Sequence, residues 1–272
     1  DLHPSINFSN IHEYFREASW DEALDYAAQG FLKIKKQRNG KSNLAGFGSA
    51  KCSNEEAYLF QKLIRTGFNT NNVDHCTRLC HASSVAALLE TIGSGAVTAP
   101  FYEVEHSDVI IVIGANPTEN HPVAATFFKN AAKKGSKLIV MDPRGHSLKK
   151  HATHMLQFKP GSDVALLNSI MNVIVEENLF NSEYIKKQTE GFEKLRKHLM
   201  NYSPDIMENE TGIDPELIRE VARLYASTNK GIIFWGMGIS QHTHGTDNAR
   251  CLISLALMTG NVGKRGSGLH PL

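Results

Sequence analysis

Residues 109–117 read VIIVIGANP, five consecutive apolar side chains followed by a glycine and a polar turn. A strand that is apolar at every position is typical of a parallel sheet covered on both faces. Two similar stretches follow, KLIVMDPR at residues 137–144 and GIIFWGMG at residues 231–238. Each predicts a buried strand that ends in a turn. We therefore expect this part of the chain to be an α/β domain.

Helical patterns separate the predicted strands. Asp163 begins a helix with apolar side chains at helical spacing, and Asp214-Pro215 is a strong helix start because proline suits the first turn. Further helices are expected over residues 122–134, 182–187, 192–199 and 246–258, with a short strand over residues 154–158. Alternating strands and helices predict a doubly wound, mostly parallel sheet with helices on both faces. Such sheets bind ligands at the carboxyl ends of their strands.

The N-terminal part of the sequence has a different pattern. Ser19 and Glu22 match the capping box that starts a helix, and Ser53–Glu56 is expected to cap a second helix. A short strand is expected between these helices at residues 43–48. Residues 69–75, NTNNVDH, are polar and predict a loop. We expect a smaller, incomplete α/β portion of a neighbouring domain at residues 1–75 and a dinucleotide-binding-like α/β domain at residues 76–272. Within the latter, Ser83 or Ser84 is expected to cap a helix that reaches about Thr91.

The charge and composition of the chain argue against several classes of function. The net charge of +1 argues against a general nucleic-acid binder. No apolar run approaches the length of a membrane span, and four cysteines are too few for a disulfide scaffold, which indicates reduced thiols and a cytoplasmic location. The chain lacks an initiating Met and stops in a loop-like stretch at residues 266–272. We therefore expect a central fragment whose natural N-terminus is absent.

The predicted strand ends carry candidate ligand-binding residues. Asp142 follows the second strand, where nucleotide-binding folds hold a ribose or base, and Gly236 and Gly238 allow a ligand to approach the backbone. No G-x-G-x-x-G loop is present, which disfavours nicotinamide binding. These segments can also be ordinary turns with polar caps. His242 and His244 suggest a metal pair, but solvent-facing or hydrogen-bonding histidines are the more common reading because no third ligand lies nearby.

Cys76 and Cys80 form a C-x3-C pair flanked by His75 and His81. This spacing is not that of common zinc fingers, and no second cysteine pair exists for a zinc or iron–sulfur site. Cysteine is also a common buried residue, so a packing role is the default. A single thiolate beside a histidine suits two sharper roles, a nucleophile or one protein ligand to a soft metal. The spacing alone does not choose between them.

The segment Asn71–His81, NNVDHCTRLCH, resembles the active-site segment of formate dehydrogenases in the bis-molybdopterin guanine dinucleotide family. Four further segments are similar in order along the chain: GANP at 114–117, MDPR at 141–144, WGMGISQH at 235–242 and TGNVG at 259–263. The resemblance therefore covers essentially the whole chain. It implies an oxidoreductase that oxidises formate to carbon dioxide at a molybdenum or tungsten centre held by two pterin–guanine nucleotides.

The resemblance also implies roles for individual residues. Cys80 would be the thiolate ligand of the metal, and His81 would accept the proton lost from formate. Asn116, Glu119, Asp142 and Arg144 would line one guanosine diphosphate arm. Gly161, Ser162 and Asp163, at a helix start, would add a further contact suited to phosphate. Gly236, Met237, Gly238 and Gln241 would line the central region near the metal and the pterins.

Two departures from the family pattern matter. The family carries a cysteine-rich [4Fe-4S] domain that would lie upstream of Asp1, and an arginine that orients formate would lie just beyond Leu272. We therefore expect this fragment to be inactive alone, with electron-acceptor subunits or domains as partners of the parent protein. Two alternatives stay open: a nitrate- or arsenate-type molybdopterin reductase, and a non-catalytic structural relative. The Cys80-His81 pair favours formate over both.

Overall fold

The computed structural model describes residues 9–36, 43–145 and 147–272. Contacts within the chain divide it into two compact units, Asp1–Arg78 and Leu79–Leu272. The boundary expected from the sequence lies between residues 75 and 76, and the division by contacts falls within the short helix α4 (Thr77–Cys80).

The first unit contains two short strands and several helical segments. Its strands, β1 (Gly46–Gly48) and β2 (Val73–His75), pair in parallel. The helices are α1 (Ile11–Tyr14), α2 (Trp20–Lys36), α3 (Asn54–Lys62) and the π-helical turn η1 (Leu63–Gly67). Both predicted helix starts are confirmed, because the hydroxyl of Ser19 accepts the amide of Glu22 at 3.2 Å and Ser53 forms a complete capping box with Glu56.

The predicted loop at residues 69–75 is wrong in its second half, which forms β2. Val73 lies beside Gly46 and His75 beside Gly48 in the parallel register. A strand of three residues, of which only Val73 is apolar, has no alternation long enough to be recognised. Its identity depends on the partner strand, which lies far earlier in the chain.

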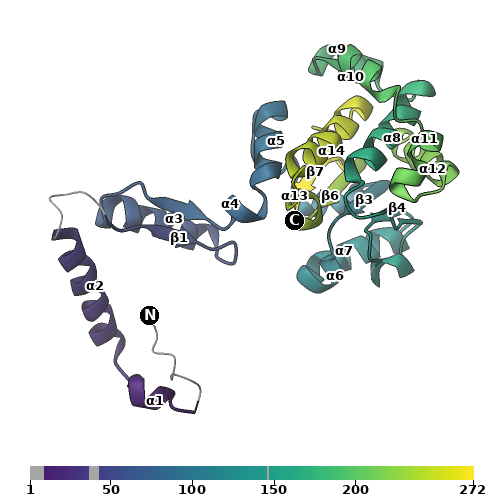
Figure 1. Cartoon of the computed structure of the whole chain (residues 1–272). Coiled ribbons are helices and arrows are strands. Elements are labelled where there is room, and N and C mark those ends of the chain that lie inside the picture. Colours follow the sequence, from purple (N-terminus) through teal and green to yellow (C-terminus); the bar gives the residue numbers. More distant parts are fainter. Residues whose placement is uncertain (1–8, 37–42, 146) are drawn as a thin grey trace. The chain divides into compact units, whose positions relative to one another are not determined.

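The second unit is built on a five-stranded sheet in which every neighbouring pair is parallel, with the order β5-β4-β3-β6-β7 (Figure 1). The strands are β3 (Val109–Ile113), β4 (Lys137–Met141), β5 (His154–Leu156), β6 (Gly231–Trp235) and β7 (Gly268–Pro271). In the central register Ile111 lies between Ile139 and Ile233. The predicted bounds of β3, β4 and β6 are confirmed.

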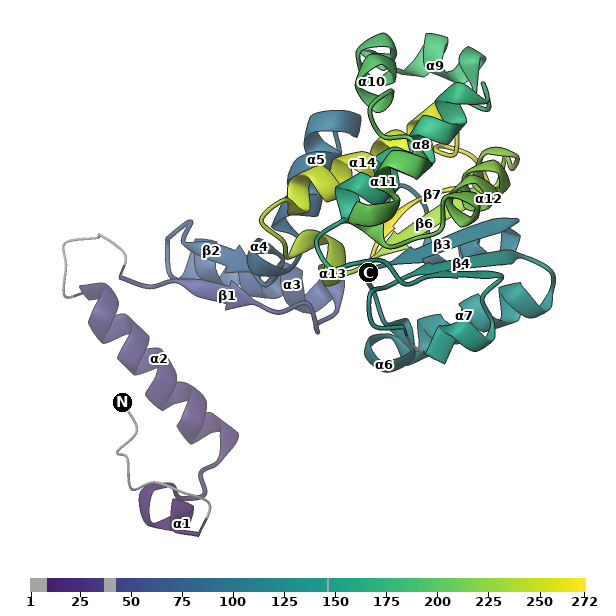
Figure 2. The same cartoon turned by 45° about the vertical axis from the view of Figure 1, so that its right-hand side comes forward.

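Helices cover both faces of this sheet, which confirms the doubly wound class. Along β3, Val109, Ile111 and Ile113 face one apolar cluster, while Ile110 and Val112 face another, as the period of two requires. The first cluster is closed by α5 (Ala82–Ile92), α8 (Asp163–Glu176), α12 (Pro215–Ala226) and α14 (Gly245–Thr259). The second is closed by η2 (Phe101–His106), α7 (Pro122–Lys133) and η3 (Ser147–Lys150), and Figure 2 shows α7 and α8 on opposite sides of the sheet.

The strand order places a topological switch between β3 and β6. From β3 the chain moves through β4 to β5 on one side, and β6 and β7 then extend the sheet on the other side. The loops that follow β3 and β6 therefore leave the sheet in different directions, and ligands of open α/β sheets bind in the crevice between such loops.

Other elements complete the second unit: α6 (Pro117–Asn120), α9 (Ser182–Gln188), α10 (Phe192–Leu199), α11 (Pro204–Thr211) and α13 (Met237–Ser240). The sequence analysis missed α11 and α13, and the loop expected at residues 266–272 contains β7. The serine cap expected for α5 is also wrong, because His81 occupies the N-cap position and makes no side-chain cap. Among the described residues, every helix is too short or too polar to traverse a bilayer.

Candidate functional site

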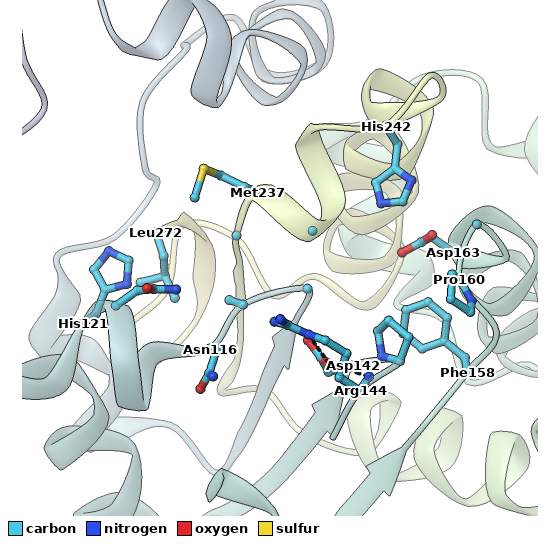
Figure 3. Close-up of a pocket in the computed structure, with 17 residues that line it drawn as sticks. Asn116, His121, Asp142, Arg144, Phe158, Pro160, Asp163, Met237, His242 and Leu272 are labelled. Atoms are coloured by element: carbon cyan, nitrogen blue, oxygen red, sulfur yellow. Dashed lines mark hydrogen bonds and ion pairs between the residues drawn. The ribbon is translucent and has the colours of Figure 1, made fainter. Parts of the chain in front are cut away.

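A cavity of about 300 Å³ opens at the carboxyl ends of β3, β4 and β6, at the topological switch (Figure 3). Segments that directly follow the strands form most of its wall: Gly114–Asn116, Asp142–Arg144 and Gly236–Gly238. The rest of the lining consists of Asn120, His121, Phe158, Pro160, Gly161, Asp163, His242 and Leu272. In Figure 3, Asp163 and His242 lie on one side of the cavity, and His121 and Leu272 lie on the other.

Two glycines let the loops after β3 and β6 touch. The amide of Gly238 donates to the carbonyl of Gly114 at 2.9 Å. A Cβ at residue 238 would lie 2.7 Å from that same carbonyl oxygen, and Gly114 itself has a φ of +57°. The sequence analysis assigned Gly236 and Gly238 to close approach of a ligand. In the structure the immediate reason is backbone packing of one loop against the other.

Two carboxyl groups are buried in the cavity wall. Asp142 is 4% exposed, and its Oδ1 accepts the amide of Arg144 at 2.8 Å. Asp163, at the first turn of α8, is 3% exposed, and burial raises its pKa above the usual value while His242 acts in the opposite direction. A desolvated carboxyl group destabilises the fold when it is ionised. Such groups in a cleft are candidates for a ligand-binding role.

Arg144 supplies a cationic group at the rim of the cavity. Its Nε lies 3.8 Å from Oδ1 of Asp142, and its side chain is 79% exposed. The guanidinium is therefore held near the cavity by one carboxylate but keeps most of its hydrogen-bond donors available to solvent or ligand. Asn116, after β3, is 9% exposed, and its Oδ1 accepts the hydroxyl of Thr118 at 2.6 Å.

The structure brings together most of the residues expected to bind the cofactor, both those of the guanosine diphosphate arm and those of the central region. Those that line the cavity are Asn116, Asp142, Arg144, Gly161, Asp163, Gly236, Met237 and Gly238. Three others lie outside its lining. Glu119 is exposed on α6, the hydroxyl of Ser162 donates to the carbonyl of Lys159 at 2.7 Å, and Gln241 donates to the carbonyl of Leu79 at 2.9 Å.

Sequence reasoning missed several residues of the wall. Phe158 and Pro160 follow β5, so the rule that located the other strand ends was available for them. His121 lies between α6 and α7, and no sequence signal marks it. His242, which the sequence analysis considered as half of a metal pair, is exposed on the turn before α14 and lines the cavity.

Cys80 and His81 lie outside the lining of this cavity but next to elements that form it. Cys80 is partly buried at the end of α4, and His81 is 9% exposed. The Nδ1 of His81 lies 2.8 Å from the hydroxyl oxygen of Ser240, and its Nε2 lies 2.8 Å from the backbone oxygen of Leu272. Burial lowers the pKa of His81, with the Leu272 contact opposing and His121 reinforcing this change.

The short helix α13 connects the cavity to the Cys80-His81 segment. At its start, Met237 and Gly238 form part of the cavity wall. At its end, Ser240 contacts the His81 ring, and the following Gln241 holds the carbonyl of Leu79. A ligand in the cavity would therefore contact the start of a helix whose end contacts His81.

The remaining cysteines offer no further metal site. Cys52 and Cys76 are exposed, and burial raises the pKa of Cys251 to about 12, which makes it a poor ligand or nucleophile. No group of three or more His, Cys, Asp or Glu side chains in the described part of the chain is arranged to hold a metal ion. A metal bound through Cys80 would need most of its ligands from a cofactor.

Comparisons with known proteins agree with this geometry. The model of the molybdopterin oxidoreductase family matches residues 4–272. The chain is 44% identical to the F420-dependent formate dehydrogenase 1 subunit alpha of Methanococcus maripaludis, with 94% of this chain and 37% of that protein aligned. It is 40% identical to formate dehydrogenase H of Escherichia coli, with 93% and 36% aligned.

A solved structure is also similar. Acetylene hydratase from Pelobacter acetylenicus superposes with a TM-score of 0.75 at 26% identity, over 93% of this chain and 34% of that one. This chain thus spans little more than a third of the proteins it matches. The family match covers nearly its whole length and agrees with the strand-end cavity: the chain belongs to the molybdopterin oxidoreductase family.

Proposed function

We propose that this chain is the part of a formate dehydrogenase catalytic subunit that binds one arm of a bis-molybdopterin guanine dinucleotide and supplies Cys80 and His81. The relatives at 40–44% identity that are named formate dehydrogenases support formate as the substrate. The fold alone does not choose the reaction, because acetylene hydratase shares it. No specific observation favours the nitrate- or arsenate-type alternative.

The observation that carries the proposal is the bridge made by α13. One end of this helix lines a nucleotide-sized cavity, and the other end contacts the histidine that follows the candidate metal ligand. In this family a single cofactor must reach from a nucleotide site to a metal ligand. The arrangement places both kinds of residue within one continuous unit, Leu79–Leu272.

The cavity residues fit the chemistry of a guanosine diphosphate arm. The buried carboxylates of Asp142 and Asp163 can only accept hydrogen bonds when ionised, which suits the N–H groups of a guanine or the hydroxyls of a ribose. The guanidinium of Arg144 suits a phosphate. Gly161 stands in open space just before the N-terminus of α8, where backbone amides and the helix dipole favour an anion.

The residues near the metal position fit formate oxidation. When bound, the molybdenum or tungsten centre would supply the acceptor for the two electrons of formate. Cys80 offers the thiolate ligand that a soft metal prefers. His81, next in sequence, can accept the one proton released as formate becomes carbon dioxide. Its burial keeps bulk water from competing for that proton.

The rest of the parent protein follows from the same proposal. Two electrons must leave the centre for each formate oxidised, so we propose a [4Fe-4S] cluster elsewhere in the parent protein and an electron-acceptor subunit or domain. A cytoplasmic location accords with the reduced cysteines. These suggestions concern the complete enzyme; this chain spans 37% of the length of the Methanococcus maripaludis relative.

The test uses the complete catalytic subunit. Formate-dependent reduction of a viologen dye and the molybdenum and tungsten content are measured for the parent, Cys80→Ser and the control Cys52→Ser, whose thiol is exposed in the first unit. We expect Cys80→Ser to lose more activity than the roughly 10–100-fold typical of outer-shell changes at metal sites, and Cys52→Ser to retain it. Parental formate oxidation by Cys80→Ser would refute the ligand role, and dye oxidation by nitrate or arsenate without formate activity would favour the alternative reductase.

A further inference from the structure

A continuous row of hydrogen bonds surrounds the ring of His81. The indole Nε1 of Trp235 donates to the hydroxyl of Ser84 at 2.8 Å. The hydroxyl oxygens of Ser84 and Ser240 lie 2.7 Å apart, and Ser240 contacts Nδ1 of His81 at 2.8 Å. On the other side of the ring, Nε2 faces the backbone oxygen of Leu272 at 2.8 Å. The row thus joins β6, α5, α13 and the end of β7.

The two ends of this row fix the direction of its terminal bonds. The indole N–H of Trp235 can only donate, and the backbone oxygen of Leu272 can only accept. Nε2 of His81 must therefore carry the hydrogen, because an unprotonated nitrogen would set two lone pairs against each other at 2.8 Å. In the neutral ring, Nδ1 is then left as an acceptor for a serine hydroxyl.

The intervening serines agree with this direction. Ser84 accepts from Trp235 and can pass its own hydrogen to Ser240, which in turn donates to Nδ1 of His81. A second route, in which Ser84 donates to Nδ1 directly, has the longer separation of 3.3 Å. Both routes leave Nδ1 unprotonated. The tautomer is therefore the same whichever hydroxyl donates.

The row of hydrogen bonds is buried, which makes a wrongly directed bond costly. Trp235 and Ser84 are fully buried, Ser240 is 5% exposed and His81 is 9% exposed. In such an environment an unpaired polar group is costly. The other tautomer would turn an unprotonated Nε2 toward the backbone oxygen of Leu272 and leave that oxygen without a donor from the ring. Water has little access to compensate for this loss.

We propose that Ser84, Ser240 and Trp235 are positioning residues that fix the orientation of the His81 ring and hold it as its Nε2–H tautomer. The proposal rests on the proposed function only for the part that His81 plays in catalysis. The tautomer itself is a property of this chain without cofactor or substrate. Loss of dehydrogenase activity and loss of the tautomer are therefore separate outcomes.

The first experiment is ¹⁵N NMR of the 272-residue chain with labelled histidine, in which the chemical shift of each ring nitrogen reports whether it carries hydrogen. The His81 signals are assigned by their disappearance in His81→Gln. We expect a protonated Nε2 and an unprotonated Nδ1 in the parent. A parent spectrum with Nδ1 protonated would overturn the proposal without any variant having to fold.

Variants then test the positioning role. The double change Ser84→Ala and Ser240→Ala removes both hydroxyl donors, so we expect the Nδ1 signal to shift and the two tautomers to mix. Ser83→Ala is the matched control, because Ser83 lies on the same turn of α5 but bonds the backbone oxygen of Ser240 at 2.6 Å. Ser240→Thr keeps a hydroxyl and should restore the parental signals. Parental His81 signals in the double variant would contradict the role of the serines.

In the complete subunit the same variants separate positioning from folding. Ser240→Ala is expected to lower kcat for formate by between about 10-fold and the 10⁴-fold limit of general acid–base catalysis, with little change in KM. Ser240→Thr is expected to recover most of kcat, and Ser83→Ala to leave it unchanged. A fall in kcat for Ser83→Ala as large as for Ser240→Ala would show a general packing effect and would overturn the assignment.

Discussion

Substitution of Gly238 by alanine tests the contact on which the cavity depends. The added Cβ would lie 2.7 Å from the carbonyl oxygen of Gly114 and 2.8 Å from its Cα, both backbone atoms that cannot rotate away. Gly114 is itself fixed, because its amide donates to the carbonyl of Met141 at 3.0 Å. The loops after β3 and β6 must therefore separate, or the start of α13 must distort.

The magnitude follows from two opposing terms. Overpacking of this kind costs about 1–3 kcal/mol, and alanine is better than glycine inside a helix by up to about 1 kcal/mol. Because the contact is with backbone, the cost should lie in the upper part of its range, which leaves a net destabilisation of about 1–2 kcal/mol. For a unit of this size, roughly 2–4 °C per kcal/mol gives a fall in Tm of about 2–8 °C.

The assay is thermal unfolding followed by near-ultraviolet circular dichroism, to which the buried Trp235 contributes. Gly30→Ala is the control, because Gly30 lies within α2 of the first unit and its added Cβ would meet no atom within 4 Å. We expect no change in the transition of the second unit for this control. A Tm for Gly238→Ala within about 1 °C of the parent would refute the argument that loop contact requires this glycine.

Three further outcomes follow from the structure. Burial raises the pKa of Asp163, so the ionised form of this residue destabilises the fold. The stability of Asp163→Asn relative to the parent should therefore increase as pH rises from about 3.5 to 7, and the advantage should be absent below the unfolded-state pKa near 4. Urea unfolding at several pH values checks this, and a stability difference that stays constant with pH would contradict it. Phe128→Ala should destabilise the second unit by about 3–5 kcal/mol, since Phe128 is fully buried in the cluster beneath β3; a urea midpoint close to the parent's would show that the site collapses around the loss. A thiol reagent near pH 8 should label the exposed Cys52 and Cys76 first and Cys251 only on unfolding, and mass spectrometry would reveal the contrary if Cys251 reacts in the folded chain.

The central strands were predictable because their burial leaves no alternative. Residues 109–113 are apolar throughout and fully enclosed in the sheet, so the apolar composition of this stretch directly reflects its burial. Gly268–Pro271 also forms a strand, but at the sheet edge, where proline and glycine are tolerated and tertiary pairing with β6 decides the conformation. The same reason hides Val73–His75. A local sequence pattern therefore identifies strands that are buried on both faces. It fails for strands whose conformation depends on pairing with one neighbouring strand.

The cavity was predictable in outline for a related reason. Parallel strands bring their carboxyl ends to one edge, so residues after separate strands, such as Asn116, Asp142 and Gly236, had to lie near one another. The direction of each side chain was not predictable. Ser162, for example, donates its hydroxyl to the carbonyl of Lys159 at 2.7 Å, a local contact that the strand pattern does not predict.

The partners of His81 could not be predicted at all, and the failure is informative. They come from residues 159 and 191 positions away, so no local rule reaches them. A local rule did apply to Ser84, which was expected to cap α5, yet its buried hydroxyl instead accepts from Trp235 and contacts Ser240. Local preferences are most often overridden where a residue serves a function. The Ser84 hydroxyl, which does not make its expected cap, thus belongs to the row that orders the ring beside Cys80 through Ser240, so loss of the tautomer should be sought first in the variant that removes both hydroxyls.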